Sequence, residues 1–181
     1  MKSRVAGLVL AAGEGRRFGG PKAPVVIDGE RLVDRAVRVL RAGGCDPVYV
    51  VLGAWIGDVP GAVVVTNPDW AEGMGSSLRV GIEAVAIDTD VDRILVTLVD
   101  LPGLTDAAVT RLVACPARLA QAAYSGERGH PVLLGREHLE GVRAATHGDR
   151  GARDYLRARL DEVTLVEVGD VATGEDLDEP A

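Results

Sequence analysis

The sequence predicts an α/β protein in which helices flank a largely parallel sheet. Short apolar runs alternate with helical patterns along the chain, as they do where crossover helices join parallel strands. These runs are continuous rather than alternating, which is typical of strands buried on both faces. The chain has 181 residues, of which 47% are hydrophobic, and this is enough for one sizeable core. We therefore expect a single domain over residues 1–181.

The first predicted strand covers residues 5–12 and ends in a glycine-rich loop. An amphipathic helix over residues 32–40 follows, because its apolar side chains recur at helical spacing. Gly43 and Gly44 should end this helix, since glycine commonly stands just past a helix C-terminus. The apolar run at residues 48–52 is the next buried strand.

A third strand is predicted at residues 63–65, and a helix should run through residues 78–85. We expect Ser76 or Ser77 to cap that helix, because a serine hydroxyl accepts a hydrogen bond from a first-turn N–H. A fourth strand over residues 94–99 follows. The alternation of strand and helix thus continues through this part of the chain.

The second half of the chain is less regular. Thr105 is the expected cap of a further helix. Beyond it we expect strands at 119–124, 131–134 and 163–168, a turn at GERGH between the first two of these, and helical stretches at 137–145 and 152–160. These elements complete an α/β pattern.

The loop GEGRRFGGPK at residues 13–22 is suited to a phosphorylated ligand. Its glycines let backbone N–H groups approach an anion closely, and Arg16, Arg17 and Lys22 supply positive charge. A triphosphate would satisfy all of these groups. Ligands of open α/β sheets bind beyond the carboxyl ends of strands, which is where this loop lies.

Three other interpretations of the loop compete with a triphosphate site. A dinucleotide fingerprint needs glycine at its first, third and sixth positions, but Gly13 and Gly15 are followed by Phe18. A P-loop needs lysine directly after its second glycine, and Pro21 precedes Lys22 here. A glycine-rich surface loop with solvated arginines stays open when the loop is taken alone.

Polar residues at other strand ends extend this site. Asp100 directly follows the run at 94–99, which places a carboxylate at the mouth of the sheet, where it could hold a divalent metal that bridges phosphates. The alternative is a helix cap or turn, but Thr105 already fills the role of a cap. Asn67, Ser76 and Ser77 are short polar residues before the N-terminus of a helix and suit a base or a ribose, whereas taken alone they indicate only a capped helix.

Composition excludes several classes of partner. The net charge is -7 and aromatic residues make up only 3%, so the chain lacks the basic face and stacking platforms of nucleic-acid binders. No signal-peptide pattern opens the chain and no apolar stretch reaches membrane-helix length. We expect a cytoplasmic protein without a nucleic-acid or membrane partner. Cys45 and Cys115 stand alone in the sequence and are expected to be reduced, partly buried residues.

With these residues identified, the sequence resembles the molybdenum cofactor nucleotidyltransferases, most closely their cytidylyltransferase branch, over almost its whole length. The segments that carry the resemblance are LAAGEGRRFGGPK (10–22), TNPDWAEGMGSSLRVGI (66–82), LVDLP (98–102), GERGHPVLLG (126–135) and HGDRGARDYL (147–156). The resemblance implies a three-layer, Rossmann-like nucleotidyltransferase fold of the GT-A-like type, with a mostly parallel mixed sheet. It also implies that the last two segments form the half that faces the pterin.

The resemblance implies roles for individual residues. Nucleotide contacts fall on Leu10, Ala11, Ala12, Gly13, Arg17, Lys22, Asn67 and Ser77, with Arg17 and Lys22 on the triphosphate. The catalytic residues would be Arg17, Lys22 and Asp100, with Asp100 as a ligand of Mg²⁺. His130 and Asp149 would contact the acceptor substrate.

The C-terminal segment supplies a candidate second metal ligand. GEDLDEPA resembles the family segment D-I-D-T-P-x-D-L, which makes Asp178 the preferred ligand, with Asp176 beside it. A register that starts at Asp170 matches as many positions but puts Ala172 at the second acidic place. A frayed acidic C-terminus is the remaining alternative.

The implied reaction transfers CMP from CTP to molybdenum-loaded molybdopterin, with release of pyrophosphate, and the product would pass to a molybdenum hydroxylase. Ala12 favours cytosine by resemblance, because guanylyl members tend to carry L-A-G-G where this chain has LAAG. A guanylyltransferase, or a nucleotidyltransferase for another small phosphate, is the first alternative. A nicotinamide-dependent oxidoreductase or a non-catalytic nucleotide-binding module is the second.

Overall fold

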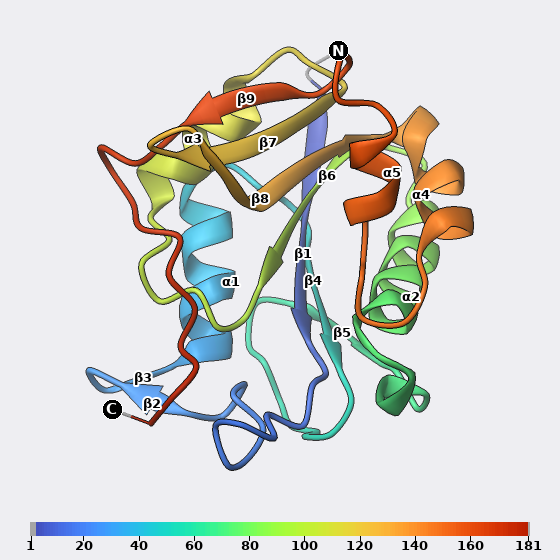
Figure 1. The fold of residues 1–181 in the computed structure, drawn as a ribbon. Helices are drawn as coiled ribbons and strands as arrows, with labels where there is room; N and C mark the ends of the chain where they lie inside the picture. The colour runs from blue at the N-terminus through green and yellow to red at the C-terminus, as the bar shows by residue number, and fades with distance from the viewer. Residues whose placement is uncertain (1–2, 181) are drawn as a thin grey trace.

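A seven-stranded sheet with the order β5-β4-β1-β6-β8-β7-β9 forms the centre of the molecule (Figure 1). Residues 3–180 are described by the structure, a computed structural model. The strands are β1 (Arg4–Ala11), β4 (Val48–Leu52), β5 (Val63–Thr66), β6 (Val91–Leu98), β7 (Leu119–Tyr124), β8 (Glu127–Gly135) and β9 (Thr164–Glu167), with a small hairpin of β2 (Val26–Ile27) and β3 (Glu30–Arg31) beside the sheet. The helices are α1 (Leu32–Ala42), α2 (Met74–Ala86), α3 (Asp106–Ala114), α4 (Leu139–Ala145) and α5 (Arg153–Arg157), with 3₁₀ turns at Trp70–Glu72 and Arg136–His138.

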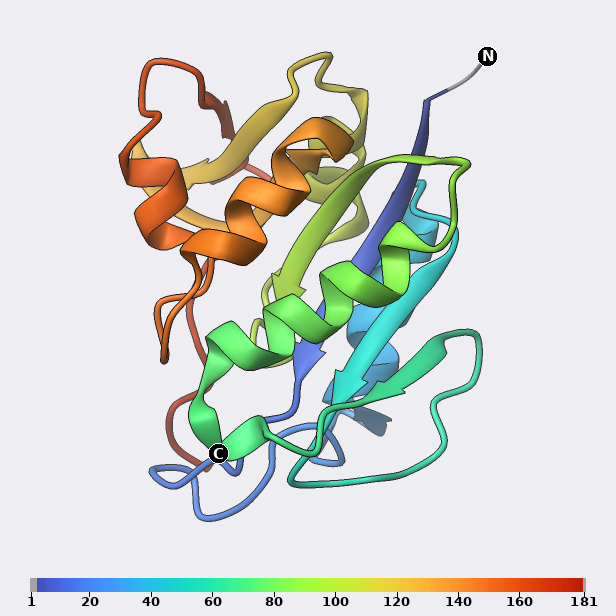
Figure 2. The same ribbon diagram turned by 90° about the vertical axis from the view of Figure 1, so that its right-hand side faces the viewer.

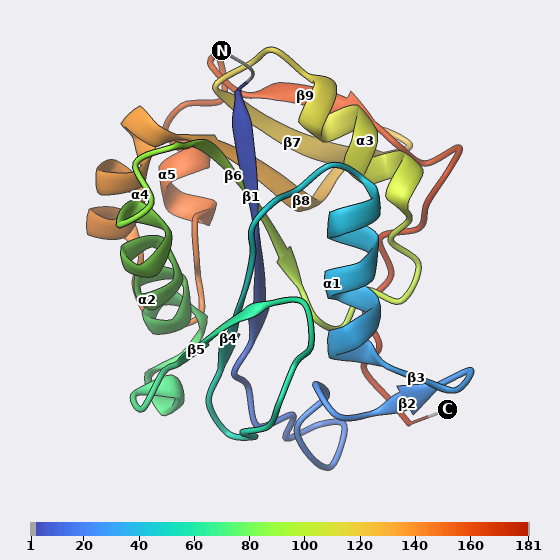
Figure 3. The same cartoon turned by 180° about the vertical axis from the view of Figure 1, so that it is seen from behind.

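Helices cover both faces of this sheet, so the fold has three layers. α2, α4 and α5 lie on one face, as Figure 2 shows, and α1 and α3 lie on the other, as Figure 3 shows. Successive residues of a strand point to opposite faces, and in β1 both sets are buried. Val9 packs in the core under α1 and α3, while Leu8 packs in the core under α2. The expected burial of β1 on both faces is confirmed.

The strands of the sheet run in one direction except β8. β5, β4, β1 and β6 pair in parallel, β8 is antiparallel to both β6 and β7, and β9 is parallel to β7. The carboxyl ends of the parallel strands therefore meet at one edge of the sheet, where ligands bind in such folds. The expected α/β fold with a mostly parallel mixed sheet is confirmed.

Several element boundaries differ from the sequence expectations for local reasons. α2 begins at Met74 rather than after Ser76 or Ser77, because Gly73 adopts a φ of 114° that suits glycine and starts the helix earlier. The turn expected at GERGH lies at Ser125 and Gly126 instead, and the rest of that segment belongs to β8. Thr105 does cap α3, because its side chain accepts a hydrogen bond from the N–H of Ala108.

Three further elements are shorter or more exposed than expected. The stretch at 137–145 starts as a 3₁₀ turn before α4, and the stretch at 152–160 is helical only over α5. β5 lies at the edge of the sheet, so Val63 and Val64 are 47% and 38% exposed. Within residues 3–180, no helix has the length and apolar character needed to cross a membrane.

An ion-pair network joins the start of β6 to the end of β8. The Arg118 guanidinium donates to the carboxylates of Asp92 and Glu137, with N···O distances of 2.6 to 3.0 Å. These bonds lower the pKa of both carboxyl groups to about 2. The network therefore stabilises the folded protein while the carboxylates are ionised.

We expect Arg118→Met to lower the free energy of unfolding at pH 7 by about 1 kcal/mol, a value reduced for solvent screening because the Arg118 side chain is 39% exposed. A lowered pKa contributes stability above the ordinary carboxyl range and loses it as the pH falls toward 2. The difference between the variant and the wild type should therefore shrink as the pH falls from about 5 toward 2. Urea unfolding at several pH values measures this, and a pH-independent difference would contradict it.

Candidate nucleotide site

A cavity of about 430 Å³ opens at the carboxyl ends of β1 and β6, beside the first turn of α2. The residues that line it are Leu10, Ala11, Ala12, Gly13, Glu14, Gly15, Arg16, Lys22, Trp70, Ala71, Gly73, Met74, Ser77, Leu98, Val99, Asp100 and Asp149. They come from segments that are far apart in the sequence. This position at the carboxyl edge of the strands is the expected place for a ligand in an open α/β sheet.

The floor of the cavity is the end of β1. The carbonyl of Leu10 accepts from the N–H of Val99, and the carbonyl of Ala12 accepts from the N–H of Ala54. These bonds tie the end of β1 to both neighbouring strands. Ala12 is buried, and its methyl group lies against Gly53, where an added Cβ would stand 2.9 Å from it. The backbone at this end of β1 is therefore held rigidly under the cavity.

The glycine loop is closed by hydrogen bonds to Gly15. The N–H groups of Gly19 and Gly20 both donate to the carbonyl of Gly15, at 2.8 and 3.1 Å. Gly15 has a φ of +62°, and a Cβ there would lie 1.9 Å from the carbonyl oxygen of Gly20. Only glycine fits this position without a movement of the backbone.

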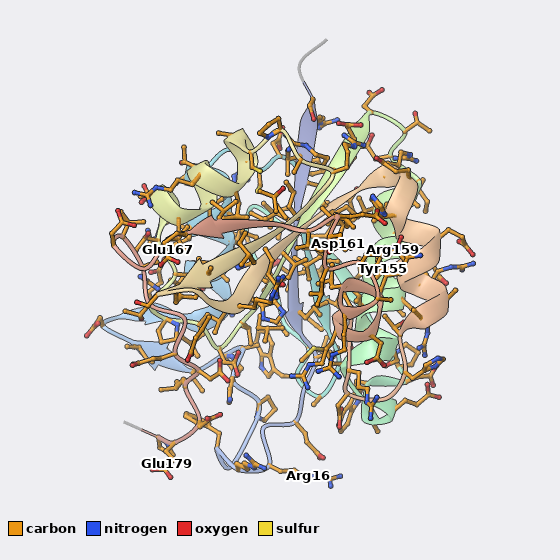
Figure 4. The ribbon with its side chains drawn as sticks, turned by 45° about the horizontal axis from the view of Figure 1, so that its top comes forward. Arg16, Tyr155, Arg159, Asp161, Glu167 and Glu179 are labelled. Carbon is orange, nitrogen blue, oxygen red and sulfur yellow. The ribbon has the colours of Figure 1, made fainter. Side chains whose placement is uncertain are left out.

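The three cationic side chains of the loop differ in whether they face the cavity. Lys22 and Arg16 line the cavity, and Arg16 forms an ion pair with Glu14. Figure 4 shows Arg16 at the outer bend of the loop, where its side chain is 85% exposed. Arg17, which the sequence assigned to the triphosphate, is exposed and does not line the cavity. In this conformation Lys22 is the cation that faces the floor of the site.

Lys22 and Asp100 form a close ion pair. Lys22 Nζ lies 2.9 Å from Asp100 Oδ2, and both side chains are largely buried, with 16% and 19% exposed. The second carboxylate oxygen, Asp100 Oδ1, is buried and has no hydrogen-bond partner among the described residues. A buried oxygen without a partner is costly. It marks the point in the site where a ligand would be most favourable.

The C-terminal segment returns to Asp100. The N–H of Leu177 donates to the Asp100 carbonyl at 2.9 Å, and Asp178 Oδ1 lies 3.9 Å from Lys22 Nζ. Burial and the charges of Asp100 and Asp178 raise the pKa of Asp176. This described part of the tail is therefore packed beside the site.

The acidic residue of the alternative register, Asp170, makes its contacts away from Asp100. Asp170 accepts two hydrogen bonds from Arg111 of α3, at 2.6 and 2.7 Å, and Ala172 is buried. Of the tail carboxylates, Asp176 and Asp178 are thus the ones near Asp100. Asp178, the preferred second ligand, is the tail carboxylate that pairs with Lys22, and no local pattern connects these two distant residues.

The fit of these carboxylates to a divalent cation depends on how many protein ligands it needs. Within residues 3–180, no three His, Cys, Asp or Glu side chains are arranged to hold a metal ion by themselves. Mg²⁺ commonly takes only one or two carboxylates and fills its other positions with water and substrate phosphates. The unpartnered Asp100 Oδ1 fits that pattern.

Asn67 supports the site from below rather than lining it. Its side chain is fully buried, and its amide nitrogen donates to the hydroxyls of Ser76 and Ser77, at 2.9 and 3.0 Å. Its amide oxygen accepts from the N–H of Asp69. These contacts leave Asn67 facing the serines, and Ser77 lines the cavity. Since Ser77 Oγ accepts from Asn67, its own proton is available to a ligand.

Of the two acceptor-side candidates, Asp149 lines the cavity and His130 does not. Asp149 lines it and lies near Gly73, where an added Cβ would stand 2.6 Å from Asp149 Oδ1. His130 is partly exposed on β8 and does not line the cavity. Burial lowers the pKa of His130, although the nearby Asp100 carboxylate opposes the effect. His130 is therefore close enough to Asp100 for an electrostatic interaction. Its lowered pKa favours the neutral imidazole at pH 7.

Trp70 and Met74 also line the cavity, although neither was a predicted site residue. Both lie within the segment TNPDWAEGMGSS, on the 3₁₀ turn and the first turn of α2. The signal for them was their position between Asn67 and Ser77. An apolar side chain in such a segment cannot be told from a core residue by pattern alone.

The chain is similar to an oxidoreductase and to a nucleotidyltransferase. It is 40% identical to nicotine blue oxidoreductase of Paenarthrobacter nicotinovorans, over 96% of this chain and 92% of that protein. It is 31% identical to the molybdenum cofactor guanylyltransferase of Rhizobium johnstonii, over 73% of this chain and 63% of that protein.

Solved structures share the whole fold. A homologue of Rv0371c from a Mycobacterium species, strain JC1, superimposes with a TM-score of 0.81 and 29% identity, and the match covers 99% of this chain and 92% of that one. Rv0371c of Mycobacterium tuberculosis, solved in complex with manganese, has a TM-score of 0.75 and 24% identity, with 92% and 89% covered. The model of the MobA-like NTP transferase domain matches residues 7–163, so this chain belongs to that family of nucleotidyltransferases.

Proposed function

We propose that the protein transfers CMP from CTP to the phosphate of molybdenum-loaded molybdopterin, and that it releases pyrophosphate. The observation that carries this proposal is the cavity in which Lys22 and Asp100 meet the glycine loop at the carboxyl ends of β1 and β6. A nucleotidyl transfer needs positioning and charge neutralisation more than a nucleophilic side chain. Among residues 3–180, those that line this cavity include no Cys or His, which suits such a reaction.

In the proposed reaction, an oxygen of the pterin phosphate attacks the α-phosphorus of CTP. The new bond joins that oxygen to the α-phosphorus, the bond to the β-phosphate oxygen breaks, and pyrophosphate carries away the released charge. Lys22, with Arg16 or Arg17 brought in from the loop, would bind the β- and γ-phosphates and stabilise the leaving group. No covalent intermediate with the protein is needed.

A divalent cation, when bound, would neutralise phosphate charge and hold the triphosphate in line for attack. Asp100 would hold it through Oδ1, with Asp178 as the second candidate ligand and Asp176 beside it. The related Rv0371c was solved with manganese, which supports a divalent ion, and Mg²⁺ is our choice for this chain. His130 and Asp149 would contact the acceptor, and a molybdenum hydroxylase would receive the product.

The choice of cytosine rests on the end of β1. Ala12 places a methyl group where guanylyl relatives tend to have glycine, and it is packed against Gly53, so it cannot move aside easily. A smaller space favours a pyrimidine over a purine. Ser77 offers a proton to an acceptor atom of the base, because Asn67 already donates to its oxygen.

The name of the Paenarthrobacter relative makes an oxidoreductase a second candidate. A nicotinamide dinucleotide normally lies with its pyrophosphate at the N-terminus of a helix that opens within the glycine fingerprint. In this chain the glycine loop leads into the β2–β3 hairpin, and α1 begins only at Leu32. The loop therefore lacks the helix that such a ligand uses, which favours nucleotidyl transfer.

Incubation with Mg²⁺, molybdenum-loaded molybdopterin and each of CTP, GTP and ATP tests the proposal. We expect pyrophosphate and molybdopterin cytosine dinucleotide with CTP alone. Turnover with GTP alone would replace the proposal by guanylyl transfer. A thermal shift with NADH but none with CTP would favour an oxidoreductase, and CTP binding without any pyrophosphate would indicate a nucleotide-sensing module.

A further inference from the structure

In the proposed reaction, Lys22 and Asp100 each have another partner that competes with their ion pair. The triphosphate would take the ammonium of Lys22, and the divalent cation would take the carboxylate of Asp100. In the free protein these two groups instead satisfy each other, at 2.9 Å and with little exposure. Neither substrate-side partner can bind fully while the pair is closed.

We infer that Lys22 is an exchangeable counterion that neutralises Asp100 in the free protein, as a divalent cation would in the loaded site. It leaves Asp100 only when a triphosphate draws its ammonium away. The cation site is thus kept weak until the nucleotide arrives. This inference rests on the proposed function, because it assigns the cavity to a nucleoside triphosphate.

The charges around Lys22 make such an exchange favourable. Asp100 and Asp178 both lie within 4 Å of Lys22 Nζ, at 2.9 and 3.9 Å. Among the residues described, no other Lys or Arg forms an ion pair with either carboxylate. When Lys22 moves to a phosphate, these carboxylates lose their counterion, and a divalent cation restores the balance.

The geometry of Asp100 explains why the cation and Lys22 exclude each other. Lys22 occupies Oδ2, while Oδ1 is buried without a partner. A cation on Oδ1 would lie close to the ammonium on Oδ2, and the two positive charges would repel in a partly buried site where water screens them weakly. Lysine suits this exchange because its charge stands at the end of a flexible stem.

The backbone on both sides of the ion pair is held by hydrogen bonds. Leu177 N–H holds the backbone of Asp100 at 2.9 Å, so the main chain that carries the carboxylate is tied down when the ammonium leaves. The carbonyl of Lys22 also accepts from the N–H of Val25 at 3.0 Å, so the backbone of Lys22 is tied down. The exchange therefore needs only a change in the rotamers of one side chain.

Two binding measurements on Lys22→Met test the inference, one with Mn²⁺ and one with CTP. The first titrates the protein with Mn²⁺ in the absence of nucleotide and follows the free aqua ion by electron paramagnetic resonance. We expect the variant to bind Mn²⁺ about tenfold or more tightly than the wild type, because a competing positive charge is removed. The second measures CTP binding in EDTA, which we expect the variant to weaken by about tenfold or more.

A gain in Mn²⁺ affinity together with a loss in CTP affinity, both from Lys22→Met, distinguishes the exchange from other roles of Lys22. A residue that only binds phosphate would weaken CTP binding and leave the Mn²⁺ affinity of the free protein unchanged, and this result overturns the inference. A residue that only supports the structure would weaken both. Lys22→Gln, which keeps a polar group toward Asp100, should reproduce the Mn²⁺ gain if Lys22→Met folds poorly.

Arg17→Met is the matched control, because it removes one positive charge from the same loop and Arg17 does not line the cavity. It should leave the Mn²⁺ affinity of the free protein within about twofold of the wild-type value. If Arg17→Met instead raised the Mn²⁺ affinity as much as Lys22→Met, the loss of one positive charge anywhere in the loop would explain both results, and the inference would be overturned. The proposed function can fail separately. If no nucleotide is turned over, the function fails whatever the Mn²⁺ result, and if CTP is turned over while Lys22→Met leaves Mn²⁺ binding unchanged, the function stands and the exchange fails.

Discussion

Asp100→Asn should lower the rate of pyrophosphate release by at least about a thousandfold. The substitution keeps the shape of the side chain but removes the charge that pairs with Lys22 at 2.9 Å and that would hold a divalent cation. Assays with CTP, Mg²⁺ and the molybdopterin acceptor, quenched at set times and analysed for pyrophosphate, measure the effect. The far-UV circular dichroism of the variant should stay unchanged, because the Asp100 backbone contacts do not depend on its carboxylate.

Asp170→Asn is the matched control for this prediction. Asp170 is the acidic residue at the start of the other possible register of the tail, and it pairs with Arg111 at the surface. Its variant should retain at least half of the wild-type turnover. Near-normal turnover of Asp100→Asn would remove the metal role from this residue, and a loss in Asp170→Asn as large as that in Asp100→Asn would move the second ligand to the other register.

Gly15→Ala should abolish measurable CTP binding at concentrations that saturate the wild type. The new Cβ would lie 1.9 Å from the carbonyl oxygen of Gly20, and the φ of +62° is already unfavourable for alanine. The loop must therefore move, which breaks the hydrogen bonds from Gly19 and Gly20 to the Gly15 carbonyl. Isothermal titration with CTP measures the binding.

Gly20→Ala provides the comparison within the same loop. A Cβ at Gly20 would meet no atom within 4 Å, and Gly20 does not adopt a positive φ. Its CTP affinity should stay within about threefold of the wild type, which is the scale of an ordinary surface change. Gly15→Ala with unchanged CTP affinity would show that the closed form of the loop is not the form that binds the nucleotide.

The strands and the position of the site could be predicted from the sequence because both depend on local pattern. Continuous apolar runs identified β1, β4 and β6, and polar residues directly after such runs identified the edge where Lys22 and Asp100 meet. The roles of side chains within the site were less accessible. The run of charged residues did not show that Arg16 lines the cavity while Arg17 does not, because neighbouring residues on a turn can point in opposite directions.

Long-range contacts explain the remaining differences. Asn67 was expected at the ligand, but it is fully buried and its amide nitrogen donates to the hydroxyl oxygens of Ser76 and Ser77. The start of α2 at Met74 depends on Gly73 and on Gly75, whose N–H donates to the Gly148 carbonyl at 2.7 Å. The approach of the tail to Asp100 through Leu177 likewise joins residues that no local pattern connects.

The reversed strand β8 bears on the solubility of the nucleotide-binding half. Along β6, the buried Leu95 pairs with Leu133 of β8, and the neighbouring residues pair in the same register. A fragment that ended at Asp100 would contain the glycine loop, Lys22 and Ser77, yet β6 would become an open edge with apolar side chains on both faces. Such an edge recruits further strands and aggregates. By pairing β8 with β6, the second half of the chain therefore also covers this edge and prevents self-association of the first half.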